Sequence, residues 1–292
     1  MTDFSFRSWM SHMARTARLA MVSRPVSLQH ELAAIAKCLD GRKAVCFTQA
    51  GGHAMPVVSG FMSQRAWIAE AMGVPQSRLL ETFRRAADHP RDWEEISQAP
   101  CQQVQIRSEV DLMRLLPIPT HSEHDNGAYI TAGLVIARNM RTGVQNVSIN
   151  RLQVHSANHL GILMLPRHLH ALYKEAEEKG DALAVAIVIG IDPLTLLSSQ
   201  AILPIDTDEL RVSSALHETP LKVAKCITSD VRVPAMSEIV IEGRLLPGVR
   251  ALEGPFGEFP KYYSAQENRE VIEVDAITHR QNPIFHTIIP AE

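Results

Sequence analysis

The run ALAVAIVIGID, residues 182–192, sets the strictest condition on the fold. It carries no charge before its final aspartate, and its valines and isoleucines favour an extended strand that is buried on both faces. Such a strand needs a layer of structure on each side. The chain can provide one, because 292 residues with 46% hydrophobic content are enough for one large domain or two ordinary ones.

Further strands are predicted on both sides of this run. Residues 130–139 and 144–155 carry two strand patterns separated by a tight polar turn at residues 140–143, which indicates a hairpin. A helix is predicted at PRHLHALYKEAEEKG, where Pro166 suits the first turn and Gly180 the end. Four more strand patterns follow: KVAKCITSDVRV, SEIVIEGRLL, REVIEVDAITHR and IFHTII. Many strands with one or two helices favour a β-barrel-like domain over a doubly wound sheet.

The N-terminal third has a different pattern. KAVCFTQA is a short apolar strand, and SQRAWIAEAMG and SRLLETFRRAADH carry apolar residues at helical spacing, which predicts a small α/β domain over residues 1–110. Residues 109–127, EVDLMRLLPIPTHSEHDNG, are interrupted by two prolines and are interpreted as a connector and loop, with HSEH as a polar turn. The predicted fold class is therefore α+β, with the strand-rich second domain over residues 111–292.

The composition argues against several classes of function. A net formal charge of −3 argues against nucleic acid as the main partner, since phosphate binding needs a basic field. No apolar run approaches the roughly 18 residues that a membrane span requires. The four cysteines are scattered without CxxC spacing, which indicates reduced thiols in a cytosolic protein rather than a disulfide framework or a zinc site.

The segment NVSINR places Asn146 and Arg151 five residues apart. Residues at that spacing face opposite sides of a regular strand. If both serve one site, the strand must bulge, twist or end between them. The alternative is an asparagine at a strand start and an arginine on a solvent face.

Four other polar residues are candidates for a site. His168 lies in the first turn of the predicted helix, where the helix dipole disfavours a cationic imidazole, and a neutral imidazole is a good metal ligand or phosphate neighbour. Ser198 and Ser199 follow the buried strand and could hold a phosphate or a polar ring edge. Glu209 is predicted to open a short strand, where its carboxylate could ligate a divalent cation. Judged one at a time, each of them is better explained by ordinary surface, packing or loop chemistry.

The loop EGPFGEFP, residues 253–260, holds two carboxylates on a constrained backbone. Its two glycines and Pro255 restrict or permit unusual backbone angles, so Glu253 and Glu258 occupy defined positions. An arginine between two carboxylates would lower the pKa of one and leave the other able to carry a proton. Arg151 is the best candidate for that arginine. The residues alone suggest a Glu–Arg–Glu site beside an Asn/His/Glu metal site, and a solvent-exposed turn is the alternative.

Five motifs together carry a resemblance to a known family. They are NVSINRLQV, the helix start RH, DEL before the strand of Cys226, SEIVIEGRLLPGV, and LEGPFGEF. In this order and near this spacing, they resemble the UbiD-like decarboxylases, which use prenylated flavin mononucleotide (prenylated FMN). The resemblance covers nearly the whole chain, and the NVSI-R-LQV form is most similar to members that act on small heteroaromatic acids. It implies an FMN-binding split β-barrel after residue 111.

The resemblance also implies a set of site residues. Asn146, His168 and Glu209 resemble the ligands of a divalent metal, manganese, that bridges to the flavin phosphate, with Arg167 or His170 as alternatives at the His168 position. A potassium ion near the phosphate is a further expectation. The residues that resemble the catalytic set are Arg151, Glu253 and Glu258, and those that resemble cofactor contacts are Thr131, Ile149, Arg167, Ser198 and Ser199.

The activity implied by the resemblance is reversible, non-oxidative decarboxylation of an unsaturated, aromatic or heteroaromatic acid. The flavin would serve as electron sink, Glu258 would protonate the carbon that loses the carboxylate, and Arg151 would orient the substrate and keep Glu253 ionised. A flavin prenyltransferase would supply the cofactor. The resemblance implies that family members continue past the equivalent of FHTIIPAE into a third domain for oligomerisation, and this domain is expected to be absent here. The alternatives are therefore a non-catalytic or partial subunit completed by a second subunit, and an ordinary flavin-reductase-like binder on the same barrel.

Overall fold

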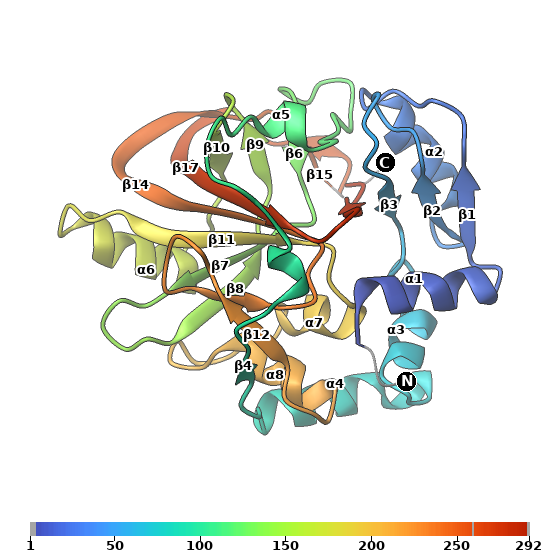
Figure 1. The fold of residues 1–292 in the computed structure, drawn as a ribbon, viewed down its shortest axis with the longest axis horizontal. Coiled ribbons are helices and arrows are strands. Elements are labelled where there is room, and N and C mark those ends of the chain that lie inside the picture. The colour runs from blue at the N-terminus through green and yellow to red at the C-terminus, as the bar shows by residue number, and fades with distance from the viewer. Residues whose placement is uncertain (1–3, 259, 291–292) are drawn as a thin grey trace.

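Two larger β-sheets organise the chain in the computed structural model, which describes residues 4–258 and 260–290 (Figure 1). The smaller sheet has the strand order β1-β2-β3-β18 and lies at the right of Figure 1. Its strands are β1 (Leu19–Val22), β2 (Ala44–Phe47), β3 (Val57–Ser59) and β18 (Phe285–His286). The helices of this part of the chain are α1 (Phe6–Arg15), α2 (Glu31–Leu39), α3 (Arg65–Ala71) and, after the 3-10 turn Gln76–Arg78, α4 (Leu79–Asp88).

The larger sheet is antiparallel throughout and curls into a half-barrel. In the described residues it has nine strands: eight in the order β6-β9-β10-β17-β14-β11-β7-β8, and β5 paired to β17. They are β5 (Val104–Ile106), β6 (Tyr129–Ile130), β7 (Leu134–Arg138), β8 (Gln145–Ile149), β9 (Leu152–Val154), β10 (His159–Ile162), β11 (Leu183–Ile189), β14 (Ile239–Glu253) and β17 (Glu267–His279). The expected fold, a small α/β unit followed by a split β-barrel, is confirmed.

The apolar run at residues 182–192 forms the central strand β11. It pairs with β14 on one side and β7 on the other, and all its residues except Ala184 are buried. The helix α6 (His168–Glu177) packs against β11 and its neighbours. The hairpin of β7 and β8 is also confirmed, with the side chain of Asn139 accepting hydrogen bonds from the N–H groups of Arg141 and Thr142 in the turn.

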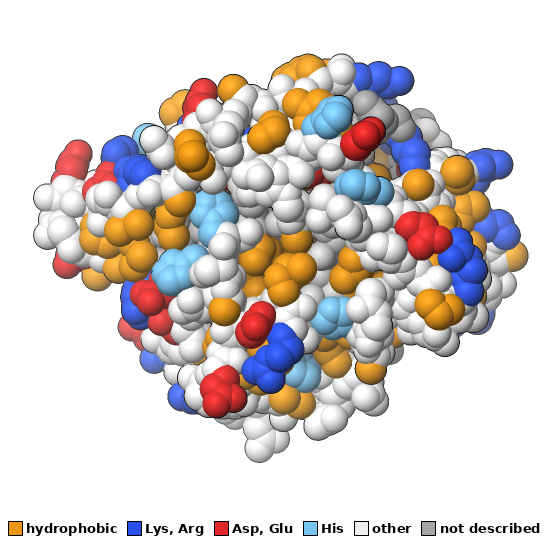
Figure 2. Space-filling model, turned by 90° about the horizontal axis from the view of Figure 1, so that it is seen from above, with side chains coloured by type: hydrophobic (Ala, Val, Ile, Leu, Met, Phe, Trp, Pro, Cys, Tyr) orange, Lys and Arg blue, Asp and Glu red, His pale blue; other side chains and the backbone are white. Residues whose placement is uncertain are grey.

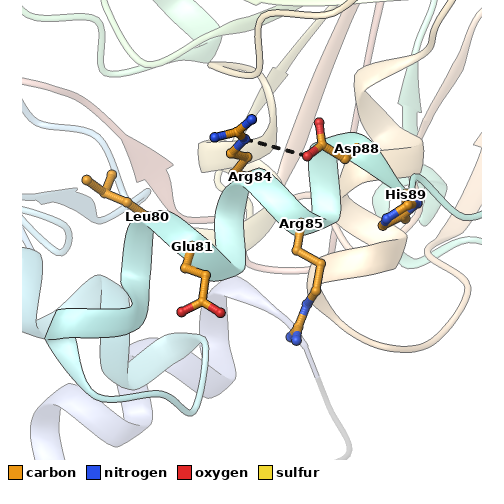
Figure 3. A pocket seen from close by; sticks show the side chains of 6 residues that line it. All are labelled: Leu80, Glu81, Arg84, Arg85, Asp88 and His89. Atoms are coloured by element: carbon orange, nitrogen blue, oxygen red, sulfur yellow. Dashed lines mark ion pairs between the residues drawn. The ribbon is translucent and has the colours of Figure 1, made fainter.

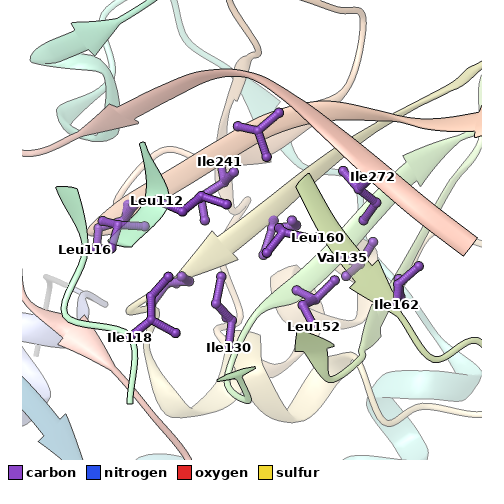
Figure 4. Close-up of a cluster of buried hydrophobic side chains, with 14 of the residues drawn as sticks. Leu112, Leu116, Ile118, Ile130, Val135, Leu152, Leu160, Ile162, Ile241 and Ile272 are labelled. Atoms are coloured by element: carbon purple, nitrogen blue, oxygen red, sulfur yellow. The ribbon is translucent and has the colours of Figure 1, made fainter. Parts of the chain in front are cut away.

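The segment interpreted as a connector contributes to the barrel core. Asp111 accepts a hydrogen bond from the N–H of Arg114 at 3.0 Å and caps the short helix α5 (Leu112–Leu115). Leu112, Leu116 and Ile118 are fully buried among barrel side chains such as Ile130 and Leu160 (Figure 4). The interpretation as a plain loop was therefore incomplete, because the prolines shape a segment whose apolar residues fill the interior.

Two helices occupy the region after β11 where the sequence analysis expected a loop and a strand. Asp192 accepts hydrogen bonds from the N–H groups of the first turn of α7 (Pro193–Ser198), and Asp208 does the same for α8 (Glu209–Leu216). The prediction that Glu209 opens a strand was wrong. Glu209 is the first residue of a helix, because an aspartate just before a helical apolar pattern is a strong N-cap. Four short strands in the second half of the chain lie outside the two larger sheets: β12 (Lys222–Lys225), β13 (Arg232–Pro234), β15 (Gly257–Glu258) and β16 (Tyr262–Tyr263).

Strand pairing connects the two parts of the chain across residue 110. The strand β4 (Glu94–Glu95) pairs with β12, β5 pairs with β17, and β18 near the C-terminal end pairs with β3. Arg7 on α1 adds an ion pair, since its Nε and Nη2 each lie 2.8 Å from the carboxylate of Glu238, which is buried. The division into domains 1–110 and 111–292 remains a prediction.

The surface and the cysteines agree with the composition. Acidic and basic side chains are interspersed on the face seen in Figure 2. Cys38 is exposed, the other three cysteines are buried, and all four are free thiols. Within residues 4–258 and 260–290, we find no helix with the length and apolar character needed to cross a membrane.

Candidate active site

A cavity of about 1070 Å³ opens beside the barrel, between β8, the start of α6, the loop after α7, and the β15–β16 hairpin. Nine of the eleven site residues predicted from the sequence line this cavity. They are Thr131, Asn146, Ile149, Arg151, Arg167, His168, Ser199, Glu209 and Glu258. The structure therefore brings together residues that are up to 127 positions apart, from Thr131 to Glu258.

Arg151 lies between the two glutamates of the 253–258 loop. Its Nε and Nη2 donate to the two carboxylate oxygens of Glu253 at 2.9 and 2.8 Å. Its Nη1 donates to Oε1 of Glu258. The exposed fractions of the side chains are 9% for Arg151, 1% for Glu253 and 29% for Glu258. One carboxylate is thus enclosed behind the guanidinium, while the other reaches the cavity.

The local backbone explains how Arg151 reaches this position. The strand β8 ends at Ile149 and β9 begins at Leu152, so the extended strand stops between Asn146 and Arg151, as a shared site required. The side chain of Asn150 secures the break by donating to the carbonyl of Leu163 at 2.9 Å. The two residues can therefore face one cavity despite their spacing of five.

The loop that carries the glutamates leaves β14 by a turn that needs glycine. Gly254 has a φ of +88°, and a Cβ at this position would lie 2.9 Å from the carbonyl oxygen of Ala265. Because Gly254 allows this left-handed conformation and close approach, β14 can end at Glu253 and return toward the cavity within a few residues. The peptide bond between Gly254 and Pro255 is cis.

Two further groups hold the guanidinium. Nη2 of Arg151 donates to the hydroxyl of Ser264 at 3.0 Å, and the guanidinium carbon lies 5.1 Å from the ring centre of Phe256. Burial would lower the pKa of Arg151, but its hydrogen bonds and charge interaction with Glu253 outweigh burial and raise the pKa above the ordinary value. Arg151 is therefore a fixed cation with a planar fork that matches a carboxylate.

A second cluster in the cavity has the donor atoms of a metal site. The Nδ2 of Asn146 donates to Oε1 of Glu209 at 3.1 Å, and the N–H of Val147 donates to Oε2 at 2.7 Å. The Oδ1 of Asn146 is buried without a hydrogen-bond partner among the described residues. Burial raises the pKa of Glu209 to about 7, although the N–H of Val147 opposes this shift. A cation near this unpaired oxygen and buried carboxylate would satisfy both, and His168 lines the same cavity.

The other residues expected to contact a cofactor differ in their surroundings. Thr131 donates from Oγ1 to the carbonyl of Ile288 at 2.6 Å, at the edge of the cavity. Arg167 is exposed and precedes the first residue of α6. Ser199 lines the cavity, whereas Ser198 is fully buried, donates to the carbonyl of Thr195 at 2.8 Å, and is not among the described residues of the lining.

Sequence reasoning did not select three residues that hold the site together. Asp125 accepts from the N–H of Gly257 at 2.8 Å, and Gln153 accepts from the N–H of Gly254 at 2.9 Å. Ser264 contacts Arg151 as described above. Asp125 lies in a DNG turn and Gln153 in the NVSINRLQV motif, so the sequence around each gave a weak indication of a structural role. No pattern around Ser264 indicated its contact with Arg151.

His121, read as part of a polar turn, is buried. Its Nε2 lies 3.0 Å from the hydroxyl of Thr287, and its ring packs edge-on against Phe256. Burial lowers its pKa to about 3, so it is a neutral packing residue. Among the residues described, no cluster of three or more His, Cys, Asp or Glu side chains is arranged to hold a metal, and the Asn146 cluster depends on an amide oxygen instead.

A separate hollow of about 440 Å³ lies on the outer surface of α4 (Figure 3). Its six lining residues lie on successive turns of α4 and at the end of that helix, and two of them, Arg84 and Asp88, form an ion pair at 3.6 Å. All six side chains come from one helix and its C-terminal end, so nothing converges on a ligand from a second element. The larger cavity is therefore the candidate active site.

Comparison with known proteins identifies the class to which this fold and site belong. The family model for the 3-octaprenyl-4-hydroxybenzoate carboxy-lyase N-terminal domain matches residues 10–87, and the model for the Rift-related domain of the same carboxy-lyase matches residues 94–292. The chain belongs to the UbiD family of decarboxylases, as the resemblance indicated.

Individual relatives agree with this assignment. The UbiD-class enzyme HmfF from Pelotomaculum thermopropionicum, in an evolved dimeric form in complex with prFMN, is 46% identical with a TM-score of 0.98, over 99% of this chain and 68% of that chain. Vanillic acid decarboxylase of Sedimentibacter hydroxybenzoicus (ShVdcCD) is 27% identical with a TM-score of 0.94, over 100% and 65% of the two chains.

Anhydromevalonate phosphate decarboxylase of Methanothermobacter thermautotrophicus is 37% identical over 237 residues, which are 81% of this chain and 55% of the relative. The chain thus spans little more than half the length of this curated relative.

Proposed function

We propose that the chain binds prenylated FMN in the 1070 Å³ cavity and takes part in the reversible, non-oxidative decarboxylation of an unsaturated, aromatic or heteroaromatic carboxylic acid. The observation that carries this proposal is Arg151 held between Glu253 and Glu258 at the wall of that cavity. The names of the relatives support the reaction type, since HmfF is described with prFMN and two other relatives are named decarboxylases.

The cofactor would be held at the end of the cavity opposite a substrate carboxylate. Asn146, His168 and Glu209 would bind a divalent cation, for which we propose manganese, and the unpaired Oδ1 of Asn146 supports this assignment. The cation would hold the cofactor phosphate. We further propose Thr131, Ile149, Arg167, Ser198 and Ser199 as cofactor contacts, and a potassium ion beside the phosphate.

The bound cofactor supplies the electron sink that makes loss of carbon dioxide possible. Arg151 would attract and orient the substrate carboxylate through its positive charge, while its Nε and Nη2 stay hydrogen-bonded to the enclosed Glu253. Glu258 reaches the cavity and would deliver a proton to the carbon that loses the carboxylate. In the carboxylation direction the same carboxylate would accept that proton.

Reconstitution tests this proposal. The chain is co-expressed with a flavin prenyltransferase, purified without oxygen in the presence of Mn²⁺, and examined by absorption spectroscopy and by carbon dioxide release from a panel of aromatic and heteroaromatic acids. We expect a bound chromophore and turnover of at least one acid. Colourless protein under these conditions would contradict the proposal.

A matched pair of variants tests the role of Glu258. Glu258→Gln should abolish turnover while the chromophore remains bound. Glu273→Gln is the control, because Glu273 is also ion-paired to an arginine, Arg244 at 2.7 Å, and its side chain is 30% exposed against 29% for Glu258, but it does not line the cavity. Turnover by Glu258→Gln at the control rate would refute the proposed proton donor.

A second candidate function is that of one component in a larger assembly. The structural relative ShVdcCD is described with a separate component, ShVdcD, in its truncated form, which favours testing for a partner. If the chain is a partial subunit, it should gain turnover only when a partner co-purifies. A homo-oligomer of this chain that turns over substrate alone would contradict an obligate partner.

A further inference from the structure

The hairpin that carries Glu258 is held weakly by its own strand pairing. The strands β15 and β16 form a separate two-stranded sheet through the pairs Gly257–Tyr263 and Glu258–Tyr262, apart from the nine-stranded sheet. A hairpin of this size is marginal in water without further packing. The position of the Glu258 carboxylate must therefore depend on contacts that anchor the hairpin to the rest of the fold.

Asp125 provides such an anchor. Its Oδ1 accepts the N–H of Gly257 at 2.8 Å, and its Oδ2 accepts the N–H of Ser122 at 2.8 Å. Hydrogen bonds to an ionised acceptor are about twice as strong as neutral ones. Asp125 is half-buried, and burial raises its pKa although both N–H groups favour its ionised form. One side chain thus joins the 122–125 turn to the residue directly before Glu258.

The backbone is built for this approach. A Cβ at Gly257 would lie 3.0 Å from Oγ and 3.4 Å from Cβ of Ser122, so the absence of a side chain lets the loop reach the turn. A second contact runs in parallel, since the N–H of Asn126 donates to the carbonyl of Pro255 at 3.0 Å. The turn therefore holds the loop at two points on either side of Phe256.

We propose that Asp125 is the positioning residue for Glu258. By fixing the amide that precedes Glu258, it keeps the Glu258 carboxylate against Arg151 and at the cavity wall. Asp125 is not among the described residues that line the cavity, so it acts through Gly257 and does not touch the substrate. The expected effect on turnover rests on the proposed function, whereas the hydrogen bond between Asp125 and Gly257 can be tested without it.

Hydrogen exchange measures the anchor directly, without turnover. In Asp125→Ala, the amide of Gly257 loses its acceptor, and we expect exchange in a peptide spanning residues 254–264 to become about tenfold faster, which corresponds to about 1.4 kcal/mol. Asp125→Ser should give the same result, because its hydroxyl is too short to reach Gly257. The control is Asp111→Ala, which removes a carboxylate that also accepts one backbone N–H, that of Arg114 at 3.0 Å, in the same segment.

Two results would overturn the anchor. One is exchange of the 254–264 peptide in Asp125→Ala no faster than in Asp111→Ala. The other is loss of the folded state in both Asp125 variants, judged by circular dichroism, because Asp125 would then support the whole fold rather than one carboxylate.

Turnover gives the functional arm in the reconstituted chain. We expect Asp125→Ala to lower kcat about tenfold or more while the chromophore and KM stay near wild-type values. Asp125→Asn should recover part of that loss, because its single amide oxygen can still accept from Gly257 but not also from Ser122. An equal loss in Asp125→Asn, or a change confined to KM, would overturn the positioning role. If the wild-type chain shows no turnover, only the proposed function fails, because the exchange result stands independently.

Discussion

The buried pair of Arg151 and Glu253 gives a prediction that needs neither cofactor nor substrate. Replacing Arg151 by methionine keeps an unbranched side chain in the space but removes the charge. Glu253 would then keep its carboxylate at 1% exposure with no arginine to pair with it. The free energy of unfolding should therefore fall more than for an ordinary surface ion pair.

The structure sets the size of this effect. Removing one partner of a buried, hydrogen-bonded pair costs about 3–5 kcal/mol, because the remaining charge is left unpaired. Replacing Arg151 removes two hydrogen bonds to Glu253, one to Glu258 and one to Ser264, so we expect the cost to fall in this range. Arg78→Met is the control, since its ion pair with Glu81 is exposed to water and should contribute little to the free energy of unfolding.

A double-mutant cycle separates the pair from general loss of packing. The variants Arg151→Met, Glu253→Met and the double variant are unfolded in urea, and their free energies of unfolding are compared. The double variant should be more stable than Arg151→Met by about 1–3 kcal/mol, because it no longer contains an unpaired buried carboxylate. A cost for Arg151→Met equal to that of Arg78→Met, or simple additivity in the cycle, would refute the reasoning.

Three further predictions concern the rest of the molecule. Glu209→Gln should weaken Mn²⁺ binding by at least about tenfold, because even the loss of a residue that only supports a metal ligand typically has an effect of that size. Equilibrium dialysis measures this affinity, and an unchanged affinity would exclude Glu209 as a ligand. Burial alone would raise the pKa of Asp192, but its interactions with His217 and Thr195 outweigh burial and hold the pKa below 3.8. The ionised Asp192 therefore stabilises the fold above that pH, and this contribution is lost as the pH falls through the folded-state pKa. Asp192→Asn should therefore remove part of the acid-side slope of stability in urea unfolding, and an unchanged slope would contradict this. Gly243→Ala should cost about 1–3 kcal/mol in the same assay, because its Cβ would lie 2.3 Å from the backbone oxygen of Glu273, and a neutral effect would show that the bulge in β14 can shift.

The sequence by itself determined the elements whose signal is local. The apolar run of β11, the polar turn after β7 and the helix α6 were all predictable, because periodicity and turn residues act over a few positions. The start of α6 was misplaced, since the helix begins at His168 and Pro166, expected in its first turn, lies before it. The constrained backbone around Gly254 could be predicted for the same reason. The family motifs extended this to a list of site residues, of which nine line one cavity.

The tertiary structure alone decided which of these residues meet, and how. Arg151 and Glu253 are 102 positions apart. No local sequence pattern predicts that the end of β8, just before Arg151, lies close to Glu253, the last residue of β14. Asp125 reaches Gly257 across 132 positions, which a turn pattern cannot reveal. Long-range pairs depend on strand order and register, and these are set by the packing of the whole interior rather than by any one segment.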